Sequence, residues 1–211
     1  MRTKTLLLSA AAIVAGIVSS QAQSNVYSAN IVGYVSVTNT ANVFVLLANP
    51  LDNGTNNLTS LFPTAPNNSQ IQVWNGAGFQ LATKQLTGNW STNLVIPPGR
   101  GFFAKFPVTG TNTFVGSVAV PVGGSVTNAL AAGLFTLVGS PIPYSDNLTG
   151  TNLNLQLANN SQIQVWNGSG FQLATKNLTG NWNTNLNIVP GEGFFLKSST
   201  ATNWVQSLIL Q

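Results

Sequence analysis

The chain has 211 residues, of which 44% are hydrophobic and only 5% are charged, and it contains neither cysteine nor histidine. It can therefore form no disulfide, and it lacks the commonest general base and the usual ligands of zinc and copper. Beyond the first 22 residues, five basic and three acidic side chains are scattered along the sequence. No basic run is present that would bind nucleic acid or anionic lipid, so we do not expect nucleic acid as a partner.

The first 22 residues have the pattern of a secretory signal peptide. Arg2 and Lys4 precede an apolar run over residues 6–18, and the small-residue site Ser20-Gln21-Ala22 follows. The run is shorter than the roughly 20 apolar residues that a membrane-spanning helix needs. We therefore expect cleavage after Ala22 and no stable membrane insertion afterwards, with an uncleaved anchor as the alternative. Export without disulfides is typical of bacteria, which predicts a bacterial cell-envelope or extracellular protein.

Strands are expected to follow the signal peptide. Side chains alternate in character over residues 31–37, and residues 43–48 form a continuous apolar run that stops at Asn49-Pro50. Residues 70–84 are predicted to form a hairpin, because residues 75–78 read Asn-Gly-Ala-Gly, which tolerates positive φ and returns the chain into a second strand. The same pattern recurs at residues 162–176.

This recurrence belongs to a longer internal repeat. Residues 67–105 return as residues 159–197 at a constant offset of 92, with 32 of 39 positions identical. We predict a signal peptide over residues 1–22, one β module over 23–121 and a second over 122–211, with the boundary near 121–132. The expected fold class is all-β, as two tandem homologous sandwich or barrel-like modules. Little helix is expected, with about one turn each at 58–62 and 128–132.

Each repeat ends in a Pro-Gly turn followed by Gly-Phe-Phe, at residues 98–103 and 190–195. Because side chains alternate across a strand, the doublet Phe102-Phe103 must send its rings to opposite faces. One ring is expected in a module core, and the other is free to meet the neighbouring module.

The acidic residues do not form a shared catalytic site. A paired-carboxylate hydrolase needs two acids together, but the first repeat carries only Asp52, and Glu192 of the second corresponds to Arg100. Asp52 and Asp146 each precede Asn, and an Asx turn is the simplest explanation for an Asp at these positions. A calcium site there would be weak, because each module offers it only one carboxylate. We expect no enzyme activity, no catalytic residue, no metal site and no cofactor.

Aromatic side chains are the one positive functional feature. Trp74 and Trp166, like Trp90 and Trp182, occupy matched positions in the two repeats, and Asn75 and Asn167 follow the first pair. Such residues can bind sugars by ring stacking and amide hydrogen bonds. Trp74 is expected on the same face of its strand as Gln70 and Gln72, so its ring is predicted to point away from the core. Trp also caps small β cores, and this explanation stays open for all four residues. The predicted ligand-binding residues are Trp74, Asn75, Trp90, Trp166, Asn167 and Trp182.

Several segments together resemble a family of uncharacterised secreted proteins of verrucomicrobial type. These segments are the signal peptide, SANIVGYV at residues 28–35, ANPLDNG at 48–54 and PGRGFF at 98–103. The resemblance covers most of the processed chain and implies export and an all-β module, with no assigned activity and no functional residues to carry over. The second repeat departs from it before Asp146, so the loop there is expected to differ.

Three functions remain open at this stage. The favoured one is a secreted, non-catalytic structural or cell-surface protein whose neutral face and strand edges serve self-association. The second is a carbohydrate-binding or adhesive module that binds surface glycans through exposed Trp. The third is a small outer-membrane β-barrel, whose spans should be about 9–11 residues long.

Overall fold

The computed structural model describes residues 31–120 and 123–208, so the predicted signal peptide lies outside the described residues. The chain is all-β with little helix, as expected. The first half, residues 31–120, contains β1 (Val32–Asn39), β2 (Phe44–Ala48), β3 (Gln70–Trp74), β4 (Phe79–Thr83), β5 (Gly101–Lys105) and β6 (Gly110–Ser117). The second half, residues 123–208, contains β7 (Ser125–Leu130), β8 (Phe135–Gly139), β9 (Asp146–Asn147), β10 (Gln162–Trp166), β11 (Phe171–Thr175), β12 (Asn187–Ile188), β13 (Gly193–Lys197) and β14 (Thr202–Ser207).

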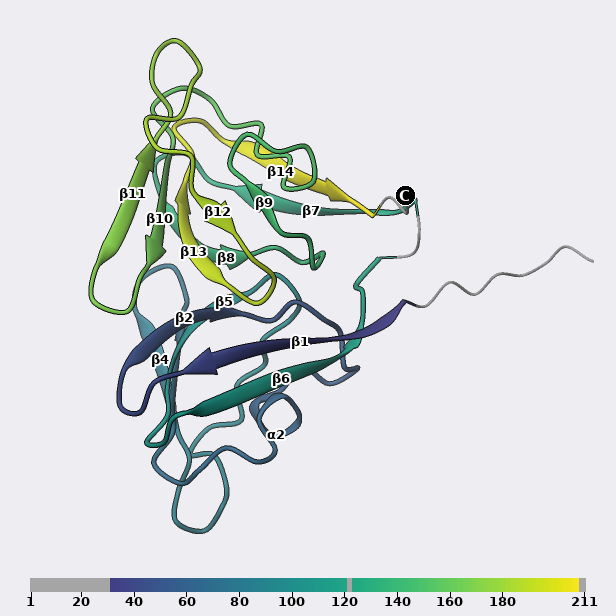
Figure 1. The fold of residues 1–211 in the computed structure, drawn as a ribbon, viewed down its shortest axis with the longest axis vertical. Coiled ribbons are helices and arrows are strands. Elements are labelled where there is room, and N and C mark those ends of the chain that lie inside the picture. Colours follow the sequence, from purple (N-terminus) through teal and green to yellow (C-terminus); the bar gives the residue numbers. More distant parts are fainter. Residues whose placement is uncertain (1–30, 121–122, 209–211) are drawn as a thin grey trace, which may run out of the picture.

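Within the described ranges, each named strand pairs only with strands of its own half, and the isolated bridges Leu47–Glu192 and Arg100–Val138 join the halves. In the first half, β1 pairs with β6, and the strand order of the larger sheet is β2-β5-β3-β4. In the second half, β7 pairs with β14, β9 pairs with β12, and the larger sheet has the order β8-β13-β10-β11. Figure 1 shows the two halves stacked, with the β1/β6 and β7/β14 ribbons extending to the same side. Each half therefore has one four-stranded sheet and one long two-stranded ribbon.

The repeated residues form the same hairpins in both halves. Gln70 faces Thr83 across β3 and β4, and Gln162 faces Thr175 across β10 and β11. Both predicted hairpins are thus confirmed. The alternation predicted for them is also present, because every second residue of β3 and β10 is buried. Identical sequences have produced identical registers, as the period of two requires.

Each half buries its own hydrophobic core. The core of the first half includes Ile71, Phe102 and Phe114, and the core of the second includes Ile163, Phe194 and Trp204. In both halves the buried set joins residues of the four-stranded sheet to one aromatic residue of the ribbon. The ribbon is thereby fixed against the sheet by apolar burial, the main stabilising contribution to folding.

Within residues 31–120 and 123–208, helix is confined to one short segment, α2 (Leu58–Leu61). Asn57 caps it, because its side-chain oxygen accepts a hydrogen bond from the amide of Ser60 at 2.9 Å. The predicted turn at residues 58–62 is confirmed. The helical turn predicted at 128–132 is wrong, since residues up to Leu130 belong to β7 and pair with β14. Tertiary pairing of alternating side chains there overrides the local helix preference.

The halves meet where each Pro-Gly turn approaches the outer strand of the other sheet. The amide of Ala48 donates to the carbonyl of Gly191 at 2.9 Å, and the amide of Gly139 donates to the carbonyl of Gly99 at 3.0 Å. The approach is so close that a Cβ at Gly139 would lie 2.1 Å from the Cβ of Ala48. A Cβ at Gly193 would lie 2.4 Å from the carbonyl oxygen of Leu47. Glycine is required here for close packing rather than for flexibility.

Candidate functional site

An aromatic groove lies between the outward faces of the two four-stranded sheets. It has a volume of about 450 Å³, and its lining comes from both halves of the chain. The lining residues are Trp74, Phe79, Phe103, Phe135, Gln164, Phe171 and Phe195. The groove therefore depends on the contacts that hold the two sheets together.

The Phe102-Phe103 doublet shows how one strand serves the core and the groove. Phe102 is fully buried in the core of the first half. Phe103 points the other way and contacts Phe195 and Trp166 of the second half, with ring centroids 6.2 Å and 6.0 Å away. The prediction that one ring enters the core and the other meets the neighbouring module is confirmed. Edge and tilted geometries of this kind are the favourable arrangements for aromatic pairs.

The paired residues Trp74 and Trp166 both lie on the outward face of their sheets, but neither ring is fully exposed. Both are half-buried, and each packs against the Phe across its own hairpin at a centroid distance of 5.0 Å. The Nε1 of Trp166 donates a 2.8 Å hydrogen bond to the carbonyl of Phe44 in the other half. The Nε1 of Trp74 is buried without a partner among the described residues. The matched positions thus differ in their polar contacts.

Asn75 and Asn167 shape the hairpin loops. The side-chain oxygen of Asn75 accepts from the amides of Ala77 at 3.0 Å and Gly78 at 2.8 Å. That of Asn167 likewise accepts from the amide of Gly170 at 2.9 Å. Both side chains are exposed. In both loops the side-chain oxygen is used to close the turn.

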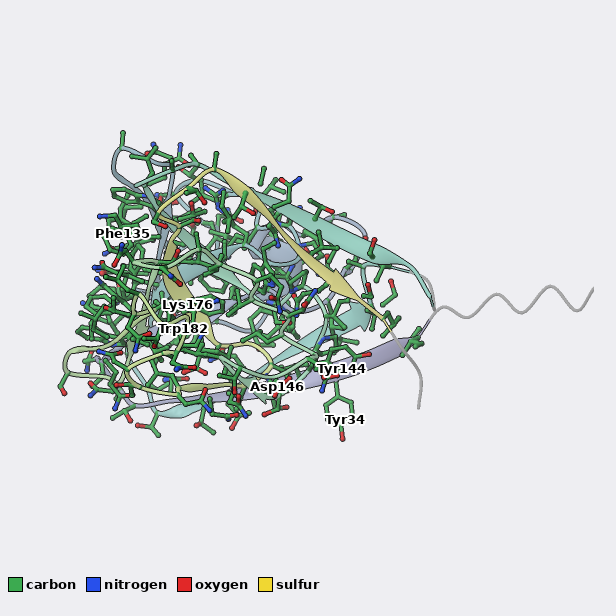
Figure 2. The ribbon with its side chains drawn as sticks, turned by 90° about the horizontal axis from the view of Figure 1, so that it is seen from above. Tyr34, Phe135, Tyr144, Asp146, Lys176 and Trp182 are labelled. Carbon is green, nitrogen blue, oxygen red and sulfur yellow. The ribbon has the colours of Figure 1, made fainter. Side chains whose placement is uncertain are left out.

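Trp90 and Trp182 lie away from the groove. Trp90 is only 7% exposed and belongs to the core of the first half, with the Nζ of Lys84 5.4 Å from the centre of its ring. Trp182 is partly buried against the second core and forms an isolated bridge with Lys176. Figure 2 labels both residues. The structure therefore places Trp74 in the groove lining and Trp166 next to it, against Phe103. Trp90 lies in the first core, and Trp182 packs against the second. As ligand-binding residues the six stay a prediction.

Six of the seven groove residues, all but Trp74, are not among the ligand-binding residues predicted from the sequence. Phe103 and Phe195 belong to the Gly-Phe-Phe signal, which indicated a contact between modules without showing a groove. Phe135 and Gln164 gave no such signal, because their place depends on how the second sheet is oriented against the first. Alternation gives the face on which a side chain lies, but not what lies opposite.

The carboxylates have structural partners. Asp52 accepts from the amide of Gly54 at 2.8 Å, which confirms the Asx turn predicted there. Asp146 accepts from the amides of Asn147 at 2.8 Å and Asn152 at 2.9 Å. Within residues 31–120 and 123–208, no three His, Cys, Asp or Glu side chains come together as a metal site would require.

Glu192 sits in the Pro-Gly turn at the junction of the halves. Burial raises the pKa of its carboxyl above the ordinary value of 4.5, and a hydrogen bond from the amide of Val189 lowers it in part. That bond measures 3.1 Å. Arg100 occupies the matching turn of the first half and donates to the carbonyl of Trp74, so the two turns carry different charges and different contacts.

Two adjoining hollows lie between the β1/β6 ribbon and the second half. The larger has a volume of about 690 Å³ and the other about 490 Å³, and both are lined by Ile31, Val118 and Pro143. Tyr34 borders the smaller hollow from β1, and Figure 2 shows its side chain extending away from the body of the molecule. These hollows bring together no acidic or basic side chain.

No helix in the described ranges is long and apolar enough to cross a membrane. Comparison of the chain with protein-family models, with curated proteins and with solved structures finds no match in any of the three.

Proposed function

We propose that the chain is a secreted, non-catalytic structural or cell-surface protein that associates with further copies of itself. The observation that carries this proposal is the presence of large exposed apolar side chains on strands without charge. Val32, Tyr34 and Val115 are 71%, 76% and 59% exposed on the outer face of the β1/β6 ribbon. Leu81 and Leu173 are 53% and 46% exposed on β4 and β11. Soluble monomers usually protect such strands with charged side chains.

The charged groups of the molecule do not offset this apolar surface. Lys84 is buried against Trp90, and Lys105 and Lys197 lie over the rings of Phe44 and Phe135 at 5.1 Å and 5.5 Å. A surface with so little exposed charge has weak mutual repulsion between molecules, which favours association. The joined halves, held by main-chain hydrogen bonds across the glycine contacts, supply a defined building unit.

The test is the molar mass of the expected processed form, residues 23–211, measured by light scattering over a concentration series. We expect the mass to rise with concentration beyond that of a single chain, and electron microscopy to show regular particles. A mass that stays at one chain across the range would contradict the proposal. Far-ultraviolet circular dichroism of the same sample confirms that the assembling material is folded and not aggregated after unfolding.

Carbohydrate binding is a second candidate, and the aromatic groove favours it. Aromatic rings from both halves and the amide of Gln164 line one open groove without any charged residue, which suits a neutral glycan chain. A glycan-binding screen of the 23–211 form tests this candidate, with Trp74→Ala as the groove variant. The matched control is Leu178→Ala, which changes an apolar side chain that is 77% exposed and outside the groove. Binding lost only with Trp74→Ala would support a lectin-like function, whereas equal binding by both variants would contradict it.

A further inference from the structure

Each four-stranded sheet has one covered edge and one open edge. The outer strand β2 is covered by the turn at Glu192, and β8 is covered by the turn at Arg100. At the opposite edges lie β4 and β11, which have the same sequence, Phe-Gln-Leu-Ala-Thr, in both halves. The molecule therefore presents two open strand edges of identical sequence.

Hydrogen bonds at both ends of the first hairpin fix which backbone groups face the open edge. The amide of Asn75 donates to the carbonyl of Gly78 at one end, and the amide of Lys84 donates to that of Ser69 at the other. In an antiparallel ladder, residue pairs that exchange main-chain hydrogen bonds alternate with pairs that do not. Counting from either end of the hairpin, Gln80 and Ala82 therefore belong to pairs that are hydrogen-bonded to β3. The N–H and C=O groups of Phe79 and Leu81 must then point away from the sheet.

The neighbouring loop satisfies only the last outward-facing residue of β4. The amide of Thr83 donates to the Ser91 hydroxyl at 3.0 Å, and the amide of Ser91 donates to the Thr83 carbonyl at 2.9 Å. This confirms the alternation independently. Further along the strand, the outward backbone groups of Phe79 and Leu81 have no partner within the described ranges. In the second half, Thr175 pairs with Asn183 in the same way, leaving Phe171 and Leu173 open.

The side chains at these positions do not protect the edge. Phe79 and Leu81 are 43% and 53% exposed, and Phe171 and Leu173 are 44% and 46% exposed. Neither strand contains a charged residue or a proline. The nearest lysines are directed inward, since Lys84 stacks on Trp90 and the Nζ of Lys176 donates to the carbonyl of Leu157 at 2.8 Å. An edge of this composition is a template for another strand.

We propose that β4 and β11 pair edge to edge with the same strands of further copies of this chain. In the antiparallel arrangement, Phe79 lies opposite Leu81 of the second copy and Leu81 lies opposite its Phe79. Each pair exchanges both of its main-chain hydrogen bonds, and the apolar side chains meet across the strands. Gln80 then faces Gln80 of the other copy at the centre. Because both halves carry the same sequence, β11 pairs in the same way with β4 or with β11.

Two such edges make each molecule bivalent. If a molecule has only one open edge, pairing of that edge with its copy uses it up, and the assembly stops at a dimer. With a second edge on the same rigid body, the dimer still has a free edge at each end and a linear polymer grows. This inference rests on the proposed self-association and identifies the surface that mediates it.

The first experiment counts open edges with charge substitutions in the 23–211 chain. Light scattering is applied to Leu81→Lys, to Leu173→Lys and to the double variant, and Tyr34→Lys tests the β1/β6 ribbon. The matched control is Leu178→Lys, at a turn position that is 77% exposed. We expect the single variants to stop at twice the mass of one chain and the double variant to remain monomeric. Tyr34→Lys and the control should both grow like the unchanged protein. Circular dichroism and thermal unfolding establish that each variant is folded.

The second experiment tests the register without blocking the edge. Paired residues that are not hydrogen-bonded have Cα atoms about 4.5 Å apart, within the range of a disulfide. Because the chain has no cysteine, Gln80→Cys introduces a single thiol, and mild oxidation should give a covalent dimer. Ser36→Cys, at an exposed position on β1, is the matched control and should remain uncrosslinked.

Three outcomes separate this inference from the proposed function. Growth of the double edge variant to the same mass as the unchanged protein overturns the edge inference and leaves self-association standing. Growth blocked by Tyr34→Lys instead overturns it too, and moves the interface to the ribbon. An unchanged protein that remains monomeric at every concentration overturns both.

Discussion

The indole nitrogen of Trp166 donates a 2.8 Å hydrogen bond to the backbone carbonyl of Phe44, a residue of the other half of the chain. The matched Trp74 has no such partner in the part of the chain that the structure describes, where its buried N–H is unpaired. The joint between two nearly identical sequences is thus asymmetric. One tryptophan fastens the second half to the first, while the other only packs against the groove.

This asymmetry predicts different costs for the same substitution. Trp166→Phe removes the donor and leaves the hydrogen bond to Phe44 unmade, whereas Trp74→Phe removes a buried donor that has no partner. Both variants lose similar ring area, so the difference isolates the hydrogen bond. We expect Trp166→Phe to lower the free energy of unfolding by about 1 kcal/mol more than Trp74→Phe. Urea unfolding followed by circular dichroism measures both, and equal losses would show that the bond to Phe44 contributes nothing.

The glycines at the junction should not tolerate a methyl group. Gly139→Ala and Gly193→Ala each place a Cβ within 2.4 Å of atoms of the other half. Overpacking of this kind costs about 1–3 kcal/mol. Gly78→Ala is the matched control, because a Cβ there has nothing within 4 Å. Thermal unfolding should separate the junction variants clearly from the control, and a control as unstable as Gly193→Ala would contradict the steric explanation.

Glu192 predicts a specific pH dependence. Its pKa is raised in the folded state above the ordinary value of 4.5, so the folded protein binds this proton more tightly than the unfolded chain does. The contribution of this group to stability is therefore present below pH 4.5 and is lost as the pH rises through the folded pKa.

The variant Glu192→Gln removes that titration while keeping an oxygen that can accept from the amide of Val189. We expect it to be more stable than the unchanged protein at pH 7 and equally stable near pH 4. The free energy of unfolding of the two proteins, measured by urea titration between pH 4 and pH 8, gives the comparison. Parallel curves over that range would mean that the carboxyl of Glu192 does not sense burial.

Asp146 is expected to stabilise the loop that follows it through more than one hydrogen bond. It accepts from the amides of Asn147 and Asn152, and a Cβ on Gly150 would lie only 1.8 Å from its carboxylate. Asp146→Ala leaves these amides without their acceptor and should cost about 1–2 kcal/mol, a fall in Tm of a few degrees. Asp146→Asn retains one acceptor oxygen and should lose less. Equal Tm values for Asp146→Ala and Asp146→Asn in scanning calorimetry would contradict this role of the carboxylate.

Much of the strand architecture followed from the sequence because it depends on local periodicity. The hairpins at residues 70–84 and 162–176 are set by alternation and by their Asn-Gly loops, and the opposed rings of Phe102 and Phe103 follow from the geometry of a strand. The helical turn expected at 128–132 failed because pairing with β14 decided the conformation of that segment.

The groove could not be predicted in the same way. The outward direction of Trp74 is a property of its own strand, whereas its partial burial depends on Phe79 and on the position of the second half. Likewise, the hydrogen bond of Trp166 joins residues 122 positions apart. Such contacts arise from how two sheets are oriented, which no pattern within either repeat encodes.

The contact between Ala48 and Gly139 also determines which halves can be joined. These two residues occupy corresponding positions of the repeat and face each other across the junction, where there is space for one methyl group. Two first halves brought together would oppose Ala48 with Ala48 and could not approach as closely. Two second halves would oppose glycine with glycine and would leave a gap. The single difference at this position therefore disfavours joints between like halves of different copies, because a first half fits best against a second half.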